Sequence, residues 1–298
     1  MMSNSKIIQS LKHIAFLFIG ISAVLLTLAM LISYEPTTGY FPSASQLPLL
    51  AVIFSVLGAV CGSAWAFTAI PAKIAASPFY RPAALVSFIG FLLCGMLLLL
   101  HTQAYLSALF FFFAALYAFL SGTSAVRQST ILLAGFGFLT VIACALGNVY
   151  CYFDISLEMN APVKVFLQTA LLFSMIYYTG EVRFLLGREK KRFYLIIAFC
   201  ALAASFPCAI AFLVAYLQGT LLRTDYLALS VCALGISISL LLRILFYTTP
   251  KKESTVTEDD TTTEQALSDS PEIPTLNSEN TDSTTNADIE EQKETDEE

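Results

Sequence analysis

Charged residues are scarce in this chain. Aspartate, glutamate, lysine and arginine make up 13% of the 298 residues, whereas a soluble globular domain carries about a quarter. The charges are also unevenly distributed. Residues 1–252 contain fifteen Lys/Arg and six Asp/Glu, and residues 253–298 contain one Lys and sixteen Asp/Glu. Such an asymmetry indicates a boundary between a basic body and an acidic tail.

Histidine occurs only twice, which excludes several kinds of chemistry. His13 and His101 are predicted at opposite ends of spans, so they cannot ligate one haem together. The chain has no HExxH zinc motif, no GxxxxGK[ST] phosphate-binding loop and no mid-span histidine that could activate a serine. The short loops leave no room for a soluble catalytic domain. We therefore expect no enzymatic activity, no catalytic residue, no metal site and no cofactor.

The seven cysteines form no CxxC pattern, and all of them fall inside predicted spans or at their ends. Disulfide frameworks and structural metal sites usually show recognisable cysteine spacings. We interpret these cysteines as small hydrophobic residues packed between helices.

Long apolar runs are abundant. Hydrophobic residues make up 57% of the chain and fall in blocks of about 17–25 residues, the length needed to cross a hydrocarbon core of about 30 Å. This pattern predicts an all-α fold, a polytopic transmembrane helical bundle within residues 1–252. The first run has no small-residue cleavage site, so we interpret it as a retained helix; cleavage would leave seven spans. The predicted spans are 14–33, 49–70, 83–100, 104–120, 131–153, 165–186, 193–217 and 226–247.

Lysine and arginine are distributed unequally between the two ends of these spans. With the N-terminus inside, thirteen lie in inner segments and only Lys164 and Arg223 lie in outer ones. Lys/Arg-rich flanks stay in the cytoplasm, so we expect a multi-pass protein of the cell membrane with both termini cytoplasmic. Residues 253–298 have fifteen Ser/Thr and almost no large apolar side chain. They are predicted to be a disordered tail, either simply solvated or regulatory through the basic inner loops.

Glu181 is the only acidic residue well inside a predicted span. It follows Lys164 by sixteen uncharged residues, which places it towards the inner end of the sixth span. At helical spacing Tyr178, Tyr177 and Ser174 share its face of the helix. The sequence therefore predicts one polar stripe on this helix.

An arginine is the expected partner of Glu181. Arg243 follows Asp225 by seventeen uncharged residues in the eighth span, at a matching depth, and Arg127 is the alternative on an inner loop. Arg183 belongs to the same candidate site but points to a different side of the sixth helix. Two other interpretations of Glu181 remain open. One is an interfacial carboxylate that reaches water or a basic loop residue, and the other is a transport or proton-coupling group.

A second polar group is predicted at the outer ends of the spans. Such an outer rim either borders a ligand pocket or is the ordinary polar edge of a bundle. Its candidate residues are Asp154, Glu158, Lys164, His101 and Arg223.

Two further features concern helix packing. Pro207 lacks a backbone N–H and is expected to kink or break the seventh span. Gly58 and Gly62 form a GxxxG pattern, whose expected use is the close approach of another helix.

Three segments carry a loose family resemblance. YFD at 152–154, MNAPVK at 159–164 and EVRFLL at 181–186 resemble multi-pass membrane proteins of Gram-positive anaerobic bacteria that have no assigned function. The resemblance covers residues 149–192 and implies a bacterial plasma membrane, but it implies no activity.

These patterns favour a non-enzymatic sensory or assembly component that acts through partners. Its expected surroundings are the lipid bilayer together with a membrane-protein partner or a second copy of itself, and no nucleic acid. The alternative is a small-solute secondary transporter that would use Glu181 and the Pro207 break.

Overall fold

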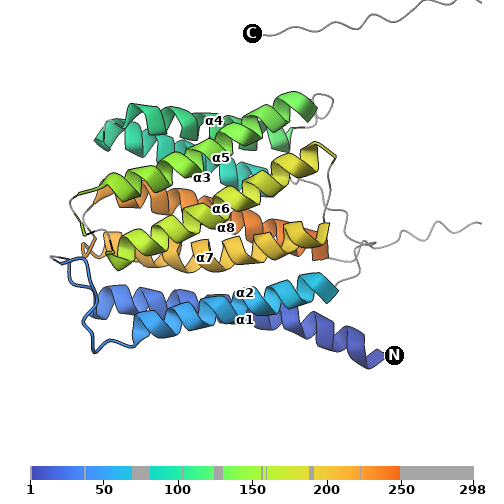
Figure 1. The fold of residues 1–298 in the computed structure, drawn as a ribbon, viewed down its shortest axis with the longest axis horizontal. Helices are drawn as coiled ribbons and strands as arrows, with labels where there is room; N and C mark the ends of the chain where they lie inside the picture. Colours follow the sequence, from blue (N-terminus) through green and yellow to red (C-terminus); the bar gives the residue numbers. More distant parts are fainter. Residues whose placement is uncertain are drawn as a thin grey trace, which may run out of the picture. The chain divides into compact units, whose positions relative to one another are not determined.

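The structure, a computed structural model, confirms the predicted all-α fold (Figure 1). It describes residues 2–36, 38–68, 81–102, 104–123, 130–155, 157–158, 160–187, 191–221 and 223–248. The predicted tail at 253–298 lies outside these residues. The helices are α1 (Met2–Ile32), α2 (Leu47–Thr68), α3 (Arg81–Leu97), α4 (Tyr105–Gly122), α5 (Thr130–Phe153), α6 (Pro162–Leu185), α7 (Lys191–Leu217) and α8 (Thr224–Thr248). A π-helical turn, Leu98–Thr102, extends α3.

The helix bounds agree with the predicted spans to within a few residues, except at the start of α1. This helix begins at Met2, whereas its apolar part, Ser10–Ile32, agrees with the predicted span to within a few residues. Residues 2–13 are largely polar but contain no glycine or proline, the residues that most disfavour a helix. Residues 69–70, predicted as the end of the second span, lie outside the described part of the chain.

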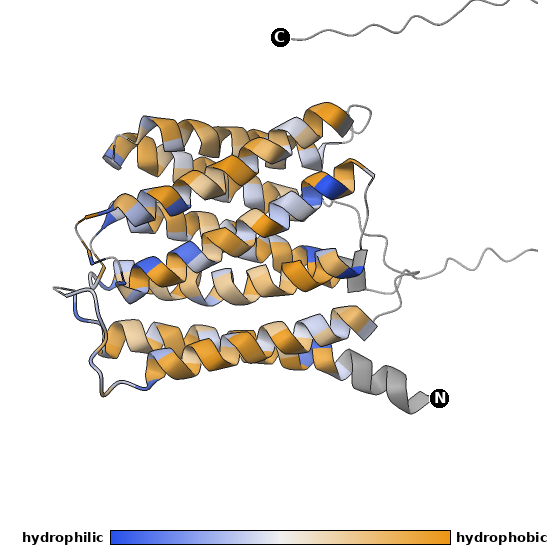
Figure 2. Ribbon diagram, in the orientation of Figure 1, coloured by the Kyte–Doolittle hydropathy of each residue, from blue (hydrophilic) through white to orange (hydrophobic). Residues whose placement is uncertain are grey.

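Seven of the eight described helices are long and apolar enough to cross a membrane, and α6 is the exception. It is more polar because it contains Lys164, Glu181 and Arg183. Its 24 residues nevertheless extend about 36 Å at the helical rise, and it runs from one end of the bundle to the other (Figure 1). Hydrophobic residues cover most of the helix length (Figure 2). The chain is therefore a multi-pass membrane protein with seven apolar helices of membrane-spanning length, and α6 lies among them with a comparable length.

Helices α3 to α8 form a closed array. Each contacts the next in sequence, and α8 returns to contact α3. Helices α1 and α2 form a hairpin that packs against α7, which makes α7 the most buried of the seven apolar helices and leaves α2 the most exposed. We call the end that holds the start of α1 and the end of α8 the inner end, and the opposite end the outer end (Figure 1).

The two glycines of the GxxxG pattern in α2 pack closely against two different helices, α1 and α7. A Cβ atom on Gly58 would lie 2.7 Å from Cγ1 of Ile19 in α1. One on Gly62 would lie 2.3 Å from Cδ1 of Phe199 in α7. The predicted packing role is confirmed, because only a residue without a side chain fits at either position.

Helix α7 continues through Pro207, so the proline does not interrupt the helix, and the predicted kink stays a prediction. Proline cannot donate a backbone hydrogen bond, and the carbonyl of Ala203, four residues earlier, therefore loses its helical partner. The hydroxyl of Ser55 in α2 donates to this carbonyl at 2.6 Å. A neighbouring helix thus supplies the hydrogen bond that proline removes, as an apolar environment requires.

Candidate functional site: an inner and an outer polar cluster

Glu181 of α6 and Arg243 of α8 form a buried ion pair towards the inner end of the bundle. The side chains are 0% and 3% exposed, respectively. Each lies about a turn and a half or less from the inner end of its helix, the matching depth that the sequence predicts. The predicted contact is therefore confirmed, and the interpretation of Glu181 as a side chain that reaches water is wrong because the residue is completely buried.

Three tyrosines complete the coordination of this carboxylate. The hydroxyl of Tyr177 donates to Oε1 of Glu181 at 2.8 Å, and that of Tyr117 in α4 donates to Oε2 at 3.0 Å. Tyr194 of α7 lies 3.2 Å from Oε1 and contacts the hydroxyl of Tyr177. Arg243 Nη1 also donates to Tyr177 at 3.0 Å. We call these five residues the inner cluster; they connect α4, α6, α7 and α8.

The other predicted members of this site have different surroundings. The ring of Tyr178 packs against the rings of Tyr177, Tyr117 and Phe91. Ser174 donates to the carbonyl of Ala170 in its own helix at 2.7 Å. Arg183 is exposed and stands outside the cluster. The polar stripe predicted on α6 is present, but only one of its three members, Tyr177, forms a hydrogen bond with Glu181.

Sequence reasoning missed Tyr117 and Tyr194. Both are buried, and each lies close to the inner end of its helix, five residues before Gly122 and three after Lys191. Helical spacing places both tyrosines near the depth of Glu181, but depth alone does not distinguish them from the other uncharged residues at that level.

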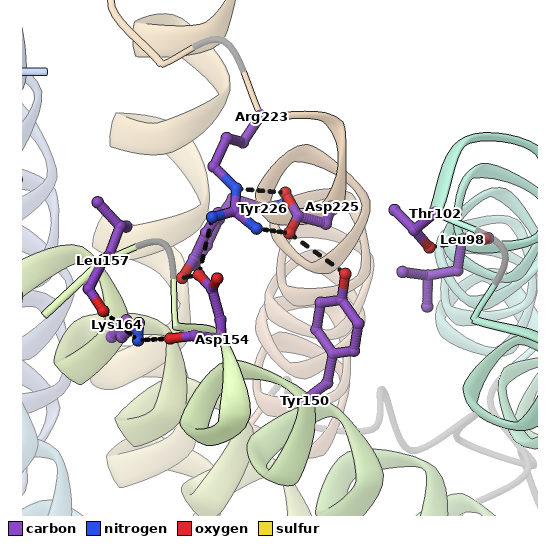
Figure 3. Close-up of polar contacts among 9 residues, drawn as sticks. All are labelled: Leu98, Thr102, Tyr150, Asp154, Leu157, Lys164, Arg223, Asp225 and Tyr226. Carbon is purple, nitrogen blue, oxygen red and sulfur yellow. Dashed lines mark hydrogen bonds and ion pairs between the residues drawn. The ribbon is translucent and has the colours of Figure 1, made fainter. Parts of the chain in front are cut away.

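The outer cluster is built around Arg223, which lies between two carboxylates (Figure 3). Its Nη1 is 2.8 Å from Oδ2 of Asp154, and its Nε donates to Oδ1 of Asp225 at 3.1 Å. Tyr226 donates to Asp154 at 2.7 Å and Tyr150 donates to Asp225 at 3.3 Å. The cluster joins the end of α5, the segment before α8 and the first turn of α8. There the negative charge of Asp225 is favoured by the helix dipole.

Lys164 holds the segment between α5 and α6 in place through hydrogen bonds to its backbone. Its Nζ donates to the carbonyls of Asp154 and Leu157, the latter at 2.8 Å, and the residue is 1% exposed. Glu158, also from this connection, accepts a hydrogen bond from Tyr40 at 2.9 Å. Each of these contacts uses a predicted outer-rim residue to hold a loop in place.

Electrostatics explain why Arg223 stays charged at this position. Burial lowers its pKa, but the hydrogen bond to Asp225 and the negative charges of Asp225 and Asp154 outweigh that effect and hold the pKa above its usual range. The hydrogen bond to Glu158 raises the pKa of Tyr40. His101, the remaining predicted rim residue, is exposed in the π-helical turn and does not join the cluster.

Both clusters are suited to fastening helices together. In each, guanidinium and phenol groups donate to the buried carboxylates, and most of these donors belong to a different helix or to a connecting segment. Among the described residues, no three His, Cys, Asp or Glu side chains gather where they could hold a metal ion, and the seven cysteines are free thiols.

The fold and these clusters define a polytopic helical membrane protein whose buried charges are held by ion pairs or by hydrogen bonds. The chain matches no protein-family model, no curated protein and no solved structure in the comparisons made. The resemblance to membrane proteins of Gram-positive anaerobic bacteria therefore stays a prediction.

Proposed function

We propose that this chain is a non-enzymatic sensory or assembly component of the cell membrane that acts through partner proteins. The observation that carries the proposal is the closure of the inner cluster. Both oxygens of Glu181 are occupied by side chains of the protein, and the residue is 0% exposed. Its role is to tie α6 to its neighbours, which leaves no position on the carboxylate for a substrate.

The alternative of a small-solute transporter has less support. A transport carboxylate has to exchange its partner for a solute, an ion or a proton. Discontinuous helices and repeated halves are also common in transporters, whereas α7 is continuous through Pro207. If helices α5 to α8 repeated helices α1 to α4, α6 would correspond to α2 and α7 to α3. Helix α6 packs against α7, but in the described residues α2 does not pack comparably against α3.

Reconstitution distinguishes these two functions. Vesicles that contain the purified protein and an internal pH dye should show no more proton flux under a membrane potential than protein-free vesicles. Extraction of native membranes in a mild detergent should yield a complex heavier than the 32.5 kDa chain. A lone chain that conducts protons would overturn the proposal and favour transport.

The proposed orientation places the inner end of the bundle in the cytoplasm. It is supported by the thirteen Lys/Arg in inner segments against two in outer ones. Reporter fusions after Lys191 and Lys252 should be active in the cytoplasm, and fusions after Gly39 and Asn160 should be active outside. An exterior result at Lys252 would contradict both the orientation and the eight crossings.

A further inference from the structure

A long apolar groove lies on the side of the bundle, bordered by α2, α6 and α7. Its volume is about 860 Å³, and its lining extends along α2 from Ala51 to Thr68. Seventeen residue steps of helix correspond to about 26 Å, which is most of the thickness of a hydrocarbon core. Neither polar cluster contributes to this groove, so its purpose needs a separate explanation.

Four of the five hydroxyl groups in the groove lining donate to backbone carbonyls, and the fifth, on Ser63, lies 3.9 Å from Sγ of Cys200. Ser22 donates to the carbonyl of Ala51 at 2.7 Å, and Ser55 donates to that of Ala203 at 2.6 Å. Thr169 donates within its own helix at 2.7 Å, as Thr68 does at 2.9 Å. A ligand in the groove therefore finds almost no polar partner along its walls. This favours a ligand whose body is a hydrocarbon.

One exposed cation stands at the inner end of this groove. The guanidinium of Arg192, in the first turn of α7, lies 5.8 Å from the ring centre of Phe67, a residue of the groove wall. Arg192 has no acidic partner among the described residues. The start of α7 adds the partial positive charge of a helix N-terminus. The inner mouth thus attracts an anion, whereas the rest of the groove accepts only apolar groups.

We propose that the groove is a binding site for an anionic glycerophospholipid, with acyl chains along α2 and α7 and the phosphate at Arg192. Bulk lipid covers any apolar surface of a membrane protein. This site differs from such a surface because it selects an anionic headgroup at one defined place. This site is independent of the proposed function.

The single tryptophan of the chain, Trp65, provides a built-in probe. It is 6% exposed and lies between the groove residues Ala64 and Phe67 of α2. The protein is placed in phosphatidylcholine vesicles that contain small fractions of brominated phosphatidylglycerol or brominated phosphatidylcholine, which quench tryptophan fluorescence at short range. We expect the brominated phosphatidylglycerol to quench at a mole fraction about fivefold lower, the preference that one basic residue gives for an anionic lipid.

Two variants locate the effect. Arg192→Gln should remove the preference and leave quenching by phosphatidylcholine unchanged. Ala64→Phe, at an exposed groove position, should fill the groove and weaken quenching by both lipids. Leu57→Phe is the matched control, because Leu57 is exposed on α2 but does not line the groove; it should behave like the wild type.

Other results would overturn the proposal. Equal quenching by both lipids in the wild type would mean that Arg192 selects no headgroup. Light scattering in detergent tests a second copy as the occupant: a dimer that Ala64→Phe dissociates would assign the groove to protein instead of lipid.

Discussion

Replacing Glu181 by glutamine should lower the free energy of unfolding by about 3–5 kcal/mol, the usual cost of removing one partner of a buried ion pair. Glutamine keeps the size of the side chain, but only its amide oxygen can accept a hydrogen bond from a tyrosine. The amide NH2 donates, so the hydroxyl that now donates to the other carboxylate oxygen has to turn and accept instead. Arg243 would remain 3% exposed without its counter-charge, and a guanidinium does not release its proton in a protein.

Arg243→Gln should be the less damaging of the two changes. An unpaired carboxylate can bind a proton, which costs about 3–4 kcal/mol at pH 7 for an ordinary glutamate and so limits the penalty. The double variant Glu181→Gln/Arg243→Gln contains no buried charge at this site. Its loss should therefore be smaller than the sum of the two single losses.

Unfolding in mixed micelles, followed by circular dichroism, measures these differences. Arg183→Gln is the matched control, because it removes an exposed charge two residues from Glu181 on the same helix. It should change the unfolding free energy by less than about 0.5 kcal/mol. Strictly additive losses in the double variant would show that the Glu181–Arg243 pair does not contribute as a pair.

Gly235→Leu should prevent α3 and α8 from packing as they do. A Cβ atom on Gly235 would lie 2.8 Å from Cα of Gly90, and one on Gly90 would lie 2.9 Å from Cα of Gly235. The obstacle is backbone, which cannot rotate away as a side chain can. Overpacking commonly costs about 1–3 kcal/mol, and we expect a loss at or above the top of this range. Gly235→Ala should already be destabilising.

Gly135→Ala is the control for helix propensity. Gly135 lies in α5, and a Cβ atom there would meet nothing within 4 Å. Because alanine favours a helix over glycine by about 0.5–1 kcal/mol, this variant should be neutral or stabilised when unfolding in mixed micelles is followed by circular dichroism. If Gly235→Ala were stabilised as well, the close crossing of α3 and α8 would be refuted.

The sequence by itself determined the fold class and the depth of its polar groups. Apolar runs of membrane-spanning length specify which segments cross the bilayer, because a helix rises a fixed 1.5 Å per residue. The same rise places Glu181 and Arg243 at one depth, since each is separated by a similar number of residues from a charge at the outer end. Their contact could therefore be predicted before any packing was known.

Only the tertiary structure decided which helices are neighbours. Apolar helices in lipid gain little from one another by hydrophobicity, so their order depends on close packing and on hydrogen bonds between helices. The approach of Gly90 to Gly235 and the bond from Ser55 to Ala203 are contacts of this kind. So are the bonds from Tyr117 and Tyr194 to Glu181, and no spacing within one helix encodes them. Residue spacing fixes position along a helix axis, whereas the partner across the interface follows from how eight helices fill space together.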